Sequence, residues 1–176
     1  MNLKLKRTPG IYLVGFMASG KSTIGRHLAH RLGWSFFDTD TEIESAENST
    51  IAEIFDTRGE SEFRNVETGI IRQHLGWIER GRPAVLALGG GAFVEPVNRA
   101  LLQDNGLVVW LNCPLHVIKR RLGDPSTRPL ARDAATFEVL FEKRREIYQL
   151  ADIHIAIESD DPAVAVESIV RHPLFQ

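Results

Sequence analysis

The chain has 176 residues, of which 43% are hydrophobic and 25% are charged, as is typical of one soluble domain around a single core. A formal net charge of -2 gives no positive field to hold nucleic acid or an anionic membrane, so we expect neither partner. The single cysteine excludes a disulfide within the chain, and no apolar run reaches the ~18 residues that a membrane span needs. We therefore expect one domain, residues 1–176, in the reducing cytoplasm.

Short apolar runs alternate with amphipathic stretches along the chain. This pattern is typical of a parallel sheet covered on both faces by helices, which places the chain in the α/β class. Strands are predicted at residues 11–14, 35–38, 84–88, 107–112 and 153–157. Helices are predicted at residues 21–32, 61–80, 114–122 and 136–150, with two short helical pieces at 41–46 and 50–55.

Two polar regions interrupt this alternation. Residues 39–59 are acidic, and residues 123–134 combine Gly, Pro, Ser, Asp and Arg, the composition of a mobile loop. Inserts of this kind in a compact α/β domain commonly carry binding groups, because a rigid scaffold positions them. We expect both regions to contribute to a functional site.

The strongest motif is GFMASGKS at residues 15–22, which fits G-x-x-x-x-G-K-[ST] between a predicted strand and a predicted helix. Gly15 and Gly20 allow the backbone to curl so that successive N–H groups point inward at a phosphate. Lys21 would reach the β and γ phosphates, and the Ser22 hydroxyl would ligate Mg²⁺. The motif therefore predicts a nucleoside triphosphate site.

Two carboxylates, Asp38 and Asp40, stand at the end of the second predicted strand. Residues two apart on an extended segment point the same way, so both could face the nucleotide, one toward Mg²⁺ and the other toward a substrate hydroxyl. The alternative is that they cap the short helix that begins near Thr41. The location at the carboxyl end of a strand, where ligands of α/β sheets bind, favours a role in the reaction over capping alone.

Three glycines, Gly89 to Gly91, follow the third predicted strand, again at a carboxyl end where ligands of open α/β sheets bind. They permit unusual φ values and let a small ligand approach the backbone, although a merely structural turn would have the same composition. Arginines in the predicted helices and loop, Arg64, Arg128 and Arg144, offer forked donors that match carboxylate and phosphate oxygens.

Together these residues resemble the bacterial shikimate kinase family of small P-loop kinases, over nearly the whole chain. The match is carried, in order, by residues 15–23, 38–40, 59–67 (GESEFRNVE), 88–92 (LGGGA), 127–130 (TRPL) and 143–148. A P-loop alone is shared by many enzymes, but the ordered set is far more specific. The resemblance implies a three-layer P-loop NTPase fold with a five-stranded parallel sheet, a helical substrate-binding subdomain at about 41–80 and a lid at about 123–134.

The resemblance also implies a role for each matching residue. ATP would be bound by Ala18, Ser19, Gly20, Lys21, Ser22, Thr23, Arg121 and Arg128. The acceptor would be bound by Asp40, Arg64, Gly89, Gly90, Gly91 and Arg144. Catalysis would fall to Lys21, Asp40 and Arg128, and Mg²⁺ would be held by Ser22 and Asp38.

The chain departs from the family pattern at a few positions. Ala18 stands where Gly is frequent in the loop, and the lid sequence differs around Arg128. Arg145 replaces a neighbour that is usually uncharged, which leaves open whether Arg144 or Arg145 faces the acceptor.

The sequence thus predicts a monomeric kinase that phosphorylates the 3-hydroxyl of shikimate in aromatic amino-acid biosynthesis, with ATP as co-substrate and Mg²⁺ as cofactor. Two alternatives remain at this point. One is a kinase for another small sugar acid, such as gluconate, and the other is a non-catalytic ATP-binding regulatory domain.

Overall fold

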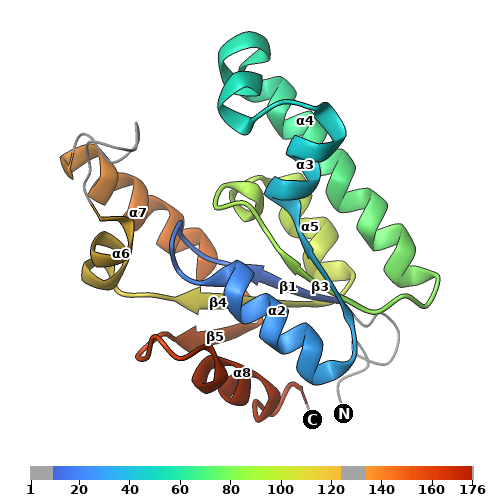
Figure 1. The fold of residues 1–176 in the computed structure, drawn as a ribbon, viewed down its shortest axis with the longest axis vertical. Helices are drawn as coiled ribbons and strands as arrows, with labels where there is room; N and C mark the ends of the chain where they lie inside the picture. The colour runs from blue at the N-terminus through green and yellow to red at the C-terminus, as the bar shows by residue number, and fades with distance from the viewer. Residues whose placement is uncertain (1–9, 124–133, 176) are drawn as a thin grey trace.

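The structure, a computed structural model, describes residues 10–123 and 134–175. Five parallel strands form one sheet in the order β2-β3-β1-β4-β5 (Figure 1). The strands are β1 (Gly10–Val14), β2 (Ser35–Asp38), β3 (Ala84–Ala87), β4 (Leu107–Asn112) and β5 (Ile153–Ala156). The predicted five-stranded parallel sheet is confirmed, with strand ends within one residue of those expected.

Helices flank the sheet, with α2 and α8 side by side on one face and α5 on the other (Figure 1). The helices are α2 (Lys21–Leu32), α3 (Thr39–Glu47), α4 (Ile51–Glu79), α5 (Pro96–Asp104), α6 (Leu115–Leu122), α7 (Ala134–Tyr148) and α8 (Pro162–Val170), with a 3₁₀ turn η1 (Ala92–Val94). Within the described residues, none of these helices is long and apolar enough to cross a membrane.

Three helical features differ from the sequence prediction. Helices α5 and α8 were not predicted. Each has nine residues and begins at a proline, Pro96 and Pro162. Proline suits the first helical turn because it lacks a backbone N–H, and an N–H at that position would have no partner within the helix. The two predicted pieces at 50–55 and 61–80 belong to one helix, α4. Gly59 interrupts α4 with a non-helical φ of 81° and ψ of 168°, so its two halves meet at a kink.

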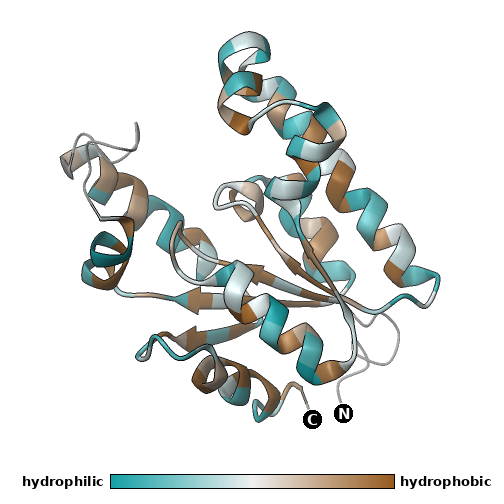
Figure 2. Cartoon of the chain, viewed as in Figure 1, coloured by the Kyte–Doolittle hydropathy of each residue, from teal (hydrophilic) through white to brown (hydrophobic). Residues whose placement is uncertain are grey.

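The main core is built on the central strands. Every residue of β1 and β3 is buried, because helices cover both faces of the sheet, and Figure 2 shows the hydrophobic colour running along these strands. A second apolar cluster, with Ile43, Ile54 and Phe63 buried, joins α3 to α4 on both sides of the Gly59 kink. This separate cluster stabilises the packing of α3 against α4, and the start of α4 projects at the top of Figure 1.

Candidate active site

The loop between β1 and α2 has the backbone that the phosphate-binding motif predicts. Gly15 and Gly20 have φ values of 150° and 97°, and a Cβ atom at Gly15 would lie 2.9 Å from the Leu111 carbonyl oxygen. Ala18 also has a positive φ of 59°, a conformation that costs a non-glycine residue about 1 kcal/mol or more. The loop is thus held in a tight conformation immediately before α2, and the N-terminus of a helix favours an anion.

Lys21 lies across this loop. Its Nζ atom donates to the carbonyl oxygens of Gly15 and Phe16, each at 2.9 Å. Burial lowers the pKa of Lys21 to about 8, and the nearby carboxylates of Asp40 and Asp38 oppose the shift. The ammonium is therefore desolvated and held beside two carboxylates, where a phosphate would find a preorganised cation.

Asp38 contacts both the P-loop and helix α3. Its Oδ2 atom accepts a hydrogen bond from the Ser22 hydroxyl, while Oδ1 accepts from the backbone N–H of Asp40 at 3.1 Å and of Thr41 at 3.4 Å. Asp38 therefore does cap α3, and a different oxygen faces Ser22. A hydroxyl and a carboxylate oxygen in contact are hard ligands of the kind that Mg²⁺ prefers, so this pair fits a magnesium site.

The prediction that Asp38 and Asp40 lie together on an extended segment was wrong. Helix α3 begins at Thr39, because the cap fixes the next residues in a helical turn, so Asp40 lies in the first turn. Both carboxylates still line one cavity of about 340 Å³. Burial raises the pKa of Asp40, and the charge of Asp38 adds to the shift.

The same cavity brings the P-loop opposite the glycine turn. Its other lining residues are Met17, Ala18, Gly20, Lys21, Ser22, Thr23, Leu88 and Gly90. Thr39 fixes the turn to α3, since its hydroxyl donates to the Ala87 carbonyl at 3.3 Å and accepts from the Gly89 N–H at 3.1 Å.

The three glycines are required because neighbouring side chains approach their backbone closely, and not because they have unusual φ values. None of Gly89, Gly90 and Gly91 has a positive φ, so that part of the prediction was wrong. A Cβ atom at Gly89 would lie 2.6 Å from Asp40 Oδ1, and one at Gly91 would overlap the Arg64 guanidinium. Side chains are excluded here because charged groups crowd against the backbone.

Arg64 comes from α4, and its guanidinium lies over Gly91. Its Nη1 atom donates to Glu67 Oε2 at 2.7 Å, and weaker pairs join it to Glu60 at 3.5 Å and Glu95 at 3.8 Å. Among the described residues, Arg64 Nε and Glu67 Oε1 are buried without a hydrogen-bond partner. Buried donors and acceptors left unpaired are costly, so the two atoms mark a place for a polar ligand.

Glu67 was not predicted as a site residue. Its side chain is 1% exposed, and burial raises its pKa to about 7 although the charge of Arg64 opposes the shift. The sequence held one signal, the three-residue spacing from Arg64 that puts both side chains on one face of a helix.

Of the two adjacent arginines on α7, Arg144 faces the glycine turn. A Cβ atom at Gly90 would lie 3.0 Å from Arg144 Nη1, and the guanidinium lies 5.6 Å from the centre of the Phe16 ring. Tyr148, one turn further, donates its hydroxyl to the Gly90 carbonyl. Arg145 is exposed and pairs with Glu142 at 3.5 Å, so the alternative that Arg145 faces this turn is wrong.

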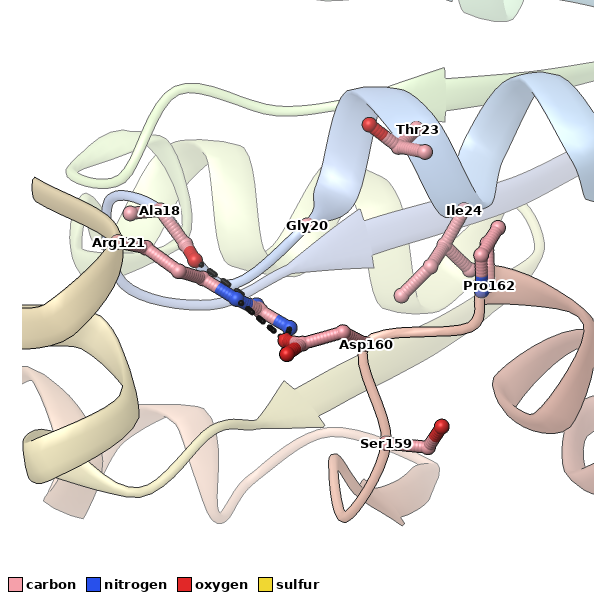
Figure 3. A pocket seen from close by; sticks show the side chains of 8 residues that line it. All are labelled: Ala18, Gly20, Thr23, Ile24, Arg121, Ser159, Asp160 and Pro162. Carbon is pink, nitrogen blue, oxygen red and sulfur yellow. Dashed lines mark hydrogen bonds and ion pairs between the residues drawn. The ribbon is translucent and has the colours of Figure 1, made fainter.

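A second cavity of about 390 Å³ lies on the other side of the P-loop (Figure 3). Arg121, from the end of α6, enters it and donates to the Ala18 carbonyl oxygen at 3.1 Å. The cavity is lined by Ala18, Gly20, Thr23, Ile24, Arg121, Ser159, Asp160 and Pro162. Arg128 and nearly all of the predicted lid lie outside the described residues.

Comparison with known proteins gives one consistent result. The family model described as shikimate kinase matches residues 17–172. A shikimate kinase from Persephonella marina is 42% identical over 161 residues, covering 91% of this chain and 96% of that protein. One from Synechococcus elongatus is 42% identical over 165 residues, covering 92% and 84%.

Solved structures agree with the family match. The structure of shikimate kinase from Acinetobacter baumannii in complex with shikimate has a TM-score of 0.84, 34% identity and coverage of 94% and 93% of the two chains. Shikimate kinase from Aquifex aeolicus gives a TM-score of 0.78 and 32% identity, covering 92% and 93%. A sugar kinase from Janibacter sp. shares only the fold, with a TM-score of 0.58 and 20% identity. From its sequence and its structure, the chain belongs to the shikimate kinase family.

Proposed function

We propose that the protein transfers the γ-phosphoryl group of ATP to the 3-hydroxyl of shikimate. The observation that carries this proposal is one cavity in which a P-loop lies opposite Asp40 and a glycine turn flanked by two arginines. A phosphate donor, a proton acceptor and cations for a carboxylate are the groups that phosphorylation of a small hydroxy acid needs.

The donor half of the reaction depends on the P-loop. Its N–H groups and Lys21 would hold the β and γ phosphates in line with the acceptor and stabilise the charge that moves to the β-phosphate oxygen. Ser22 and Asp38 would hold Mg²⁺, and the ion would supply positive charge that offsets the negative charge of the ATP phosphates.

The acceptor half depends on Asp40, Arg64 and Arg144. The two guanidinium groups would bind the carboxylate of shikimate, and the glycine backbone would let its ring lie close to the sheet. As the acceptor oxygen bonds to the γ-phosphorus and the bond from phosphorus to the β-γ bridging oxygen breaks, the hydroxyl proton would pass to Asp40. A carboxylate whose pKa is raised, as that of Asp40 is, holds that proton more readily.

We extend the proposal to Arg128 as a contact of the transferring phosphoryl group. By the family pattern it would lie over the transferring phosphoryl group in a closed lid, with Arg121 beside the adenine. Its planar fork would contact phosphate oxygens in a way that lysine cannot reproduce.

We also propose that the protein is a cytoplasmic monomer. The P-loop, Asp40, the glycine turn and Arg144 come together within a single chain, which supports a monomer, and Cys113 is a buried free thiol, which suits a reducing compartment. Sedimentation equilibrium at micromolar concentration tests the oligomeric state, and a two-fold higher mass would contradict it.

A coupled assay of ADP release tests the activity itself. Release should require ATP, Mg²⁺ and shikimate together, and kcat/KM for shikimate should exceed that for gluconate by orders of magnitude. Preference for gluconate would favour the sugar-acid alternative. ATP binding without any acceptor-dependent ADP release would favour a non-catalytic regulatory domain.

A further inference from the structure

An ion-pair network joins Asp160, which lines the cavity in Figure 3, to Arg120 and Arg121 at the end of α6. Asp160 Oδ1 accepts from Arg121 Nε at 3.2 Å and from Nη2 at 2.8 Å, and Oδ2 accepts from Arg120 Nη2 at 2.7 Å. Both carboxylate oxygens are therefore used. The contact spans 39 residues of sequence and joins α6 to the loop before α8.

This network leaves the Arg121 guanidinium in one orientation. Nη1 donates to the Ala18 carbonyl on one side, while Nε and Nη2 donate to Asp160 on the other. All three nitrogens thus have protein acceptors, and the side chain is only 24% exposed. An arginine free to rotate would sample many rotamers, whereas this one is fixed at both ends of its fork.

Because the donors at the edge of the Arg121 guanidinium are bonded to the protein, its flat face is the part left for a ligand. Planar aromatic rings stack on such a face, and a nucleobase is a planar aromatic ring. The apolar atoms of Ile24 and Pro162 lie across the cavity from Arg121 (Figure 3), so a flat, partly apolar ligand bound there would have apolar contacts opposite the guanidinium. The cavity adjoins the P-loop at Ala18 and Gly20, which is where the base of a nucleotide would extend from phosphates held by that loop.

We propose that Asp160 is a positioning residue for the nucleobase. It holds Arg121 as one wall of the base site, so that the base is bound by stacking and the donors of Arg121 remain on the protein. The inference rests on the proposed function, in which Arg121 lies beside adenine, and adds a role for a carboxylate that touches neither the phosphates nor the acceptor.

The inference can be tested by comparing a ligand that has a base with one that has only phosphates. ADP and inorganic tripolyphosphate are titrated calorimetrically into the parent protein and into Asp160→Ala. Glu158→Ala is the matched control, because Glu158 is an exposed carboxylate two residues earlier in the same loop. Asp160→Glu tests whether a carboxylate on a longer side chain restores the ion pair with Arg121. The melting temperature of each variant checks that it folds, and Asp160 is 64% exposed, so its loss should leave the fold intact.

We expect Asp160→Ala to weaken ADP binding by about 3- to 10-fold, within the range of one lost stacking or charge contact. Tripolyphosphate binding should stay unchanged, Asp160→Glu should recover part of the loss, and Glu158→Ala should match the parent. In the coupled assay, KM for ATP should rise while kcat and KM for the acceptor do not.

Two results would overturn the inference while leaving the proposed function intact. Unchanged ADP binding by Asp160→Ala would show that Arg121 needs no carboxylate to form the wall. Equal losses for ADP and tripolyphosphate would show that the substitution acts through Ala18 on the phosphate loop. Failure of the parent protein itself to bind ADP would instead overturn the proposed function, and this inference with it.

Discussion

The phosphate side and the acceptor side of the cavity are built in different ways. The phosphate side is one continuous segment, residues 15–23, whose backbone N–H groups would do most of the binding in the proposed function. The acceptor side brings together four separate segments: α3 with Asp40, α4 with Arg64, the glycine turn after β3, and α7 with Arg144. A continuous loop needs only its own conformation, whereas the acceptor side needs the helices to be correctly packed on the sheet.

The two sides also differ in how charge is balanced. Lys21 donates to two backbone carbonyls, and no carboxylate within residues 10–123 and 134–175 is bonded to it directly. Arg64 is already paired with Glu67 and lies near Glu60 and Glu95. A carboxylate ligand must therefore compete with, or add to, contacts that Arg64 makes within the protein. We therefore expect binding on the acceptor side to depend more strongly on the geometry of the ligand than binding on the phosphate side.

The largest effect is expected where the two sides meet. Asp40→Asn keeps the shape of the side chain but removes the proton acceptor, so kcat should fall about 10² to 10⁴-fold while ADP affinity changes little. Glu44→Gln, which removes an exposed carboxylate one turn further along α3, is the control and should retain turnover. A kcat within a few-fold of the parent would exclude Asp40 as the base.

Lys21→Met tests the phosphate side alone. Loss of a preorganised cation typically costs about 10² to 10³ in rate, and we expect that loss here with an unchanged melting temperature. Steady-state kinetics at saturating acceptor measures it. Turnover close to that of the parent would contradict the phosphate-binding role of the loop.

The adjacent arginines of α7 test the acceptor side alone. Arg144→Ala should lower kcat/KM for shikimate by about 10- to 100-fold, as expected for a lost hydrogen bond to a charged group, and should leave KM for ATP nearly unchanged. Arg145→Ala removes the same charge from the exposed side of the same helix and should have no such effect. Equal losses in both variants would mean that the effect is electrostatic at long range rather than a contact.

The smallest effect expected is on stability and depends on Glu67. Its pKa of about 7 lies above the usual 4.5, so between these values the folded protein keeps a proton that the unfolded chain releases. Stability contributed by this proton is present below pH 4.5 and is lost as pH rises through 7. Urea unfolding at pH 5 and pH 8 should show this decline in the parent, and Glu67→Gln should reduce it by about 1 to 3 kcal/mol. An identical decline in the variant would show that Glu67 ionises normally.

The sequence predicted the sheet and the P-loop well because both depend on local patterns. Buried parallel strands are continuous apolar runs, and the loop motif has fixed spacing. Helices α5 and α8 were missed although each begins at a proline, a residue that suits the first helical turn. The backbone at Asp40 was wrongly predicted to be extended, because a cap at Asp38 starts helix α3 earlier than composition indicates. The burial of Glu67 and the pairing of Asp160 depend on tertiary packing, which leaves little trace in local sequence.

The hydrogen bond from Tyr148 to the glycine turn gives the acceptor side a built-in optical probe. The Tyr148 ring lies 6.2 Å from the ring of Trp110, a tryptophan that is buried in β4. A ligand that moves Gly90 would shift the tyrosine and so change the surroundings of the indole. The emission of Trp110 should therefore respond to acceptor binding, and single-tryptophan variants that keep only Trp110 would allow acceptor occupancy to be followed by fluorescence without any added label.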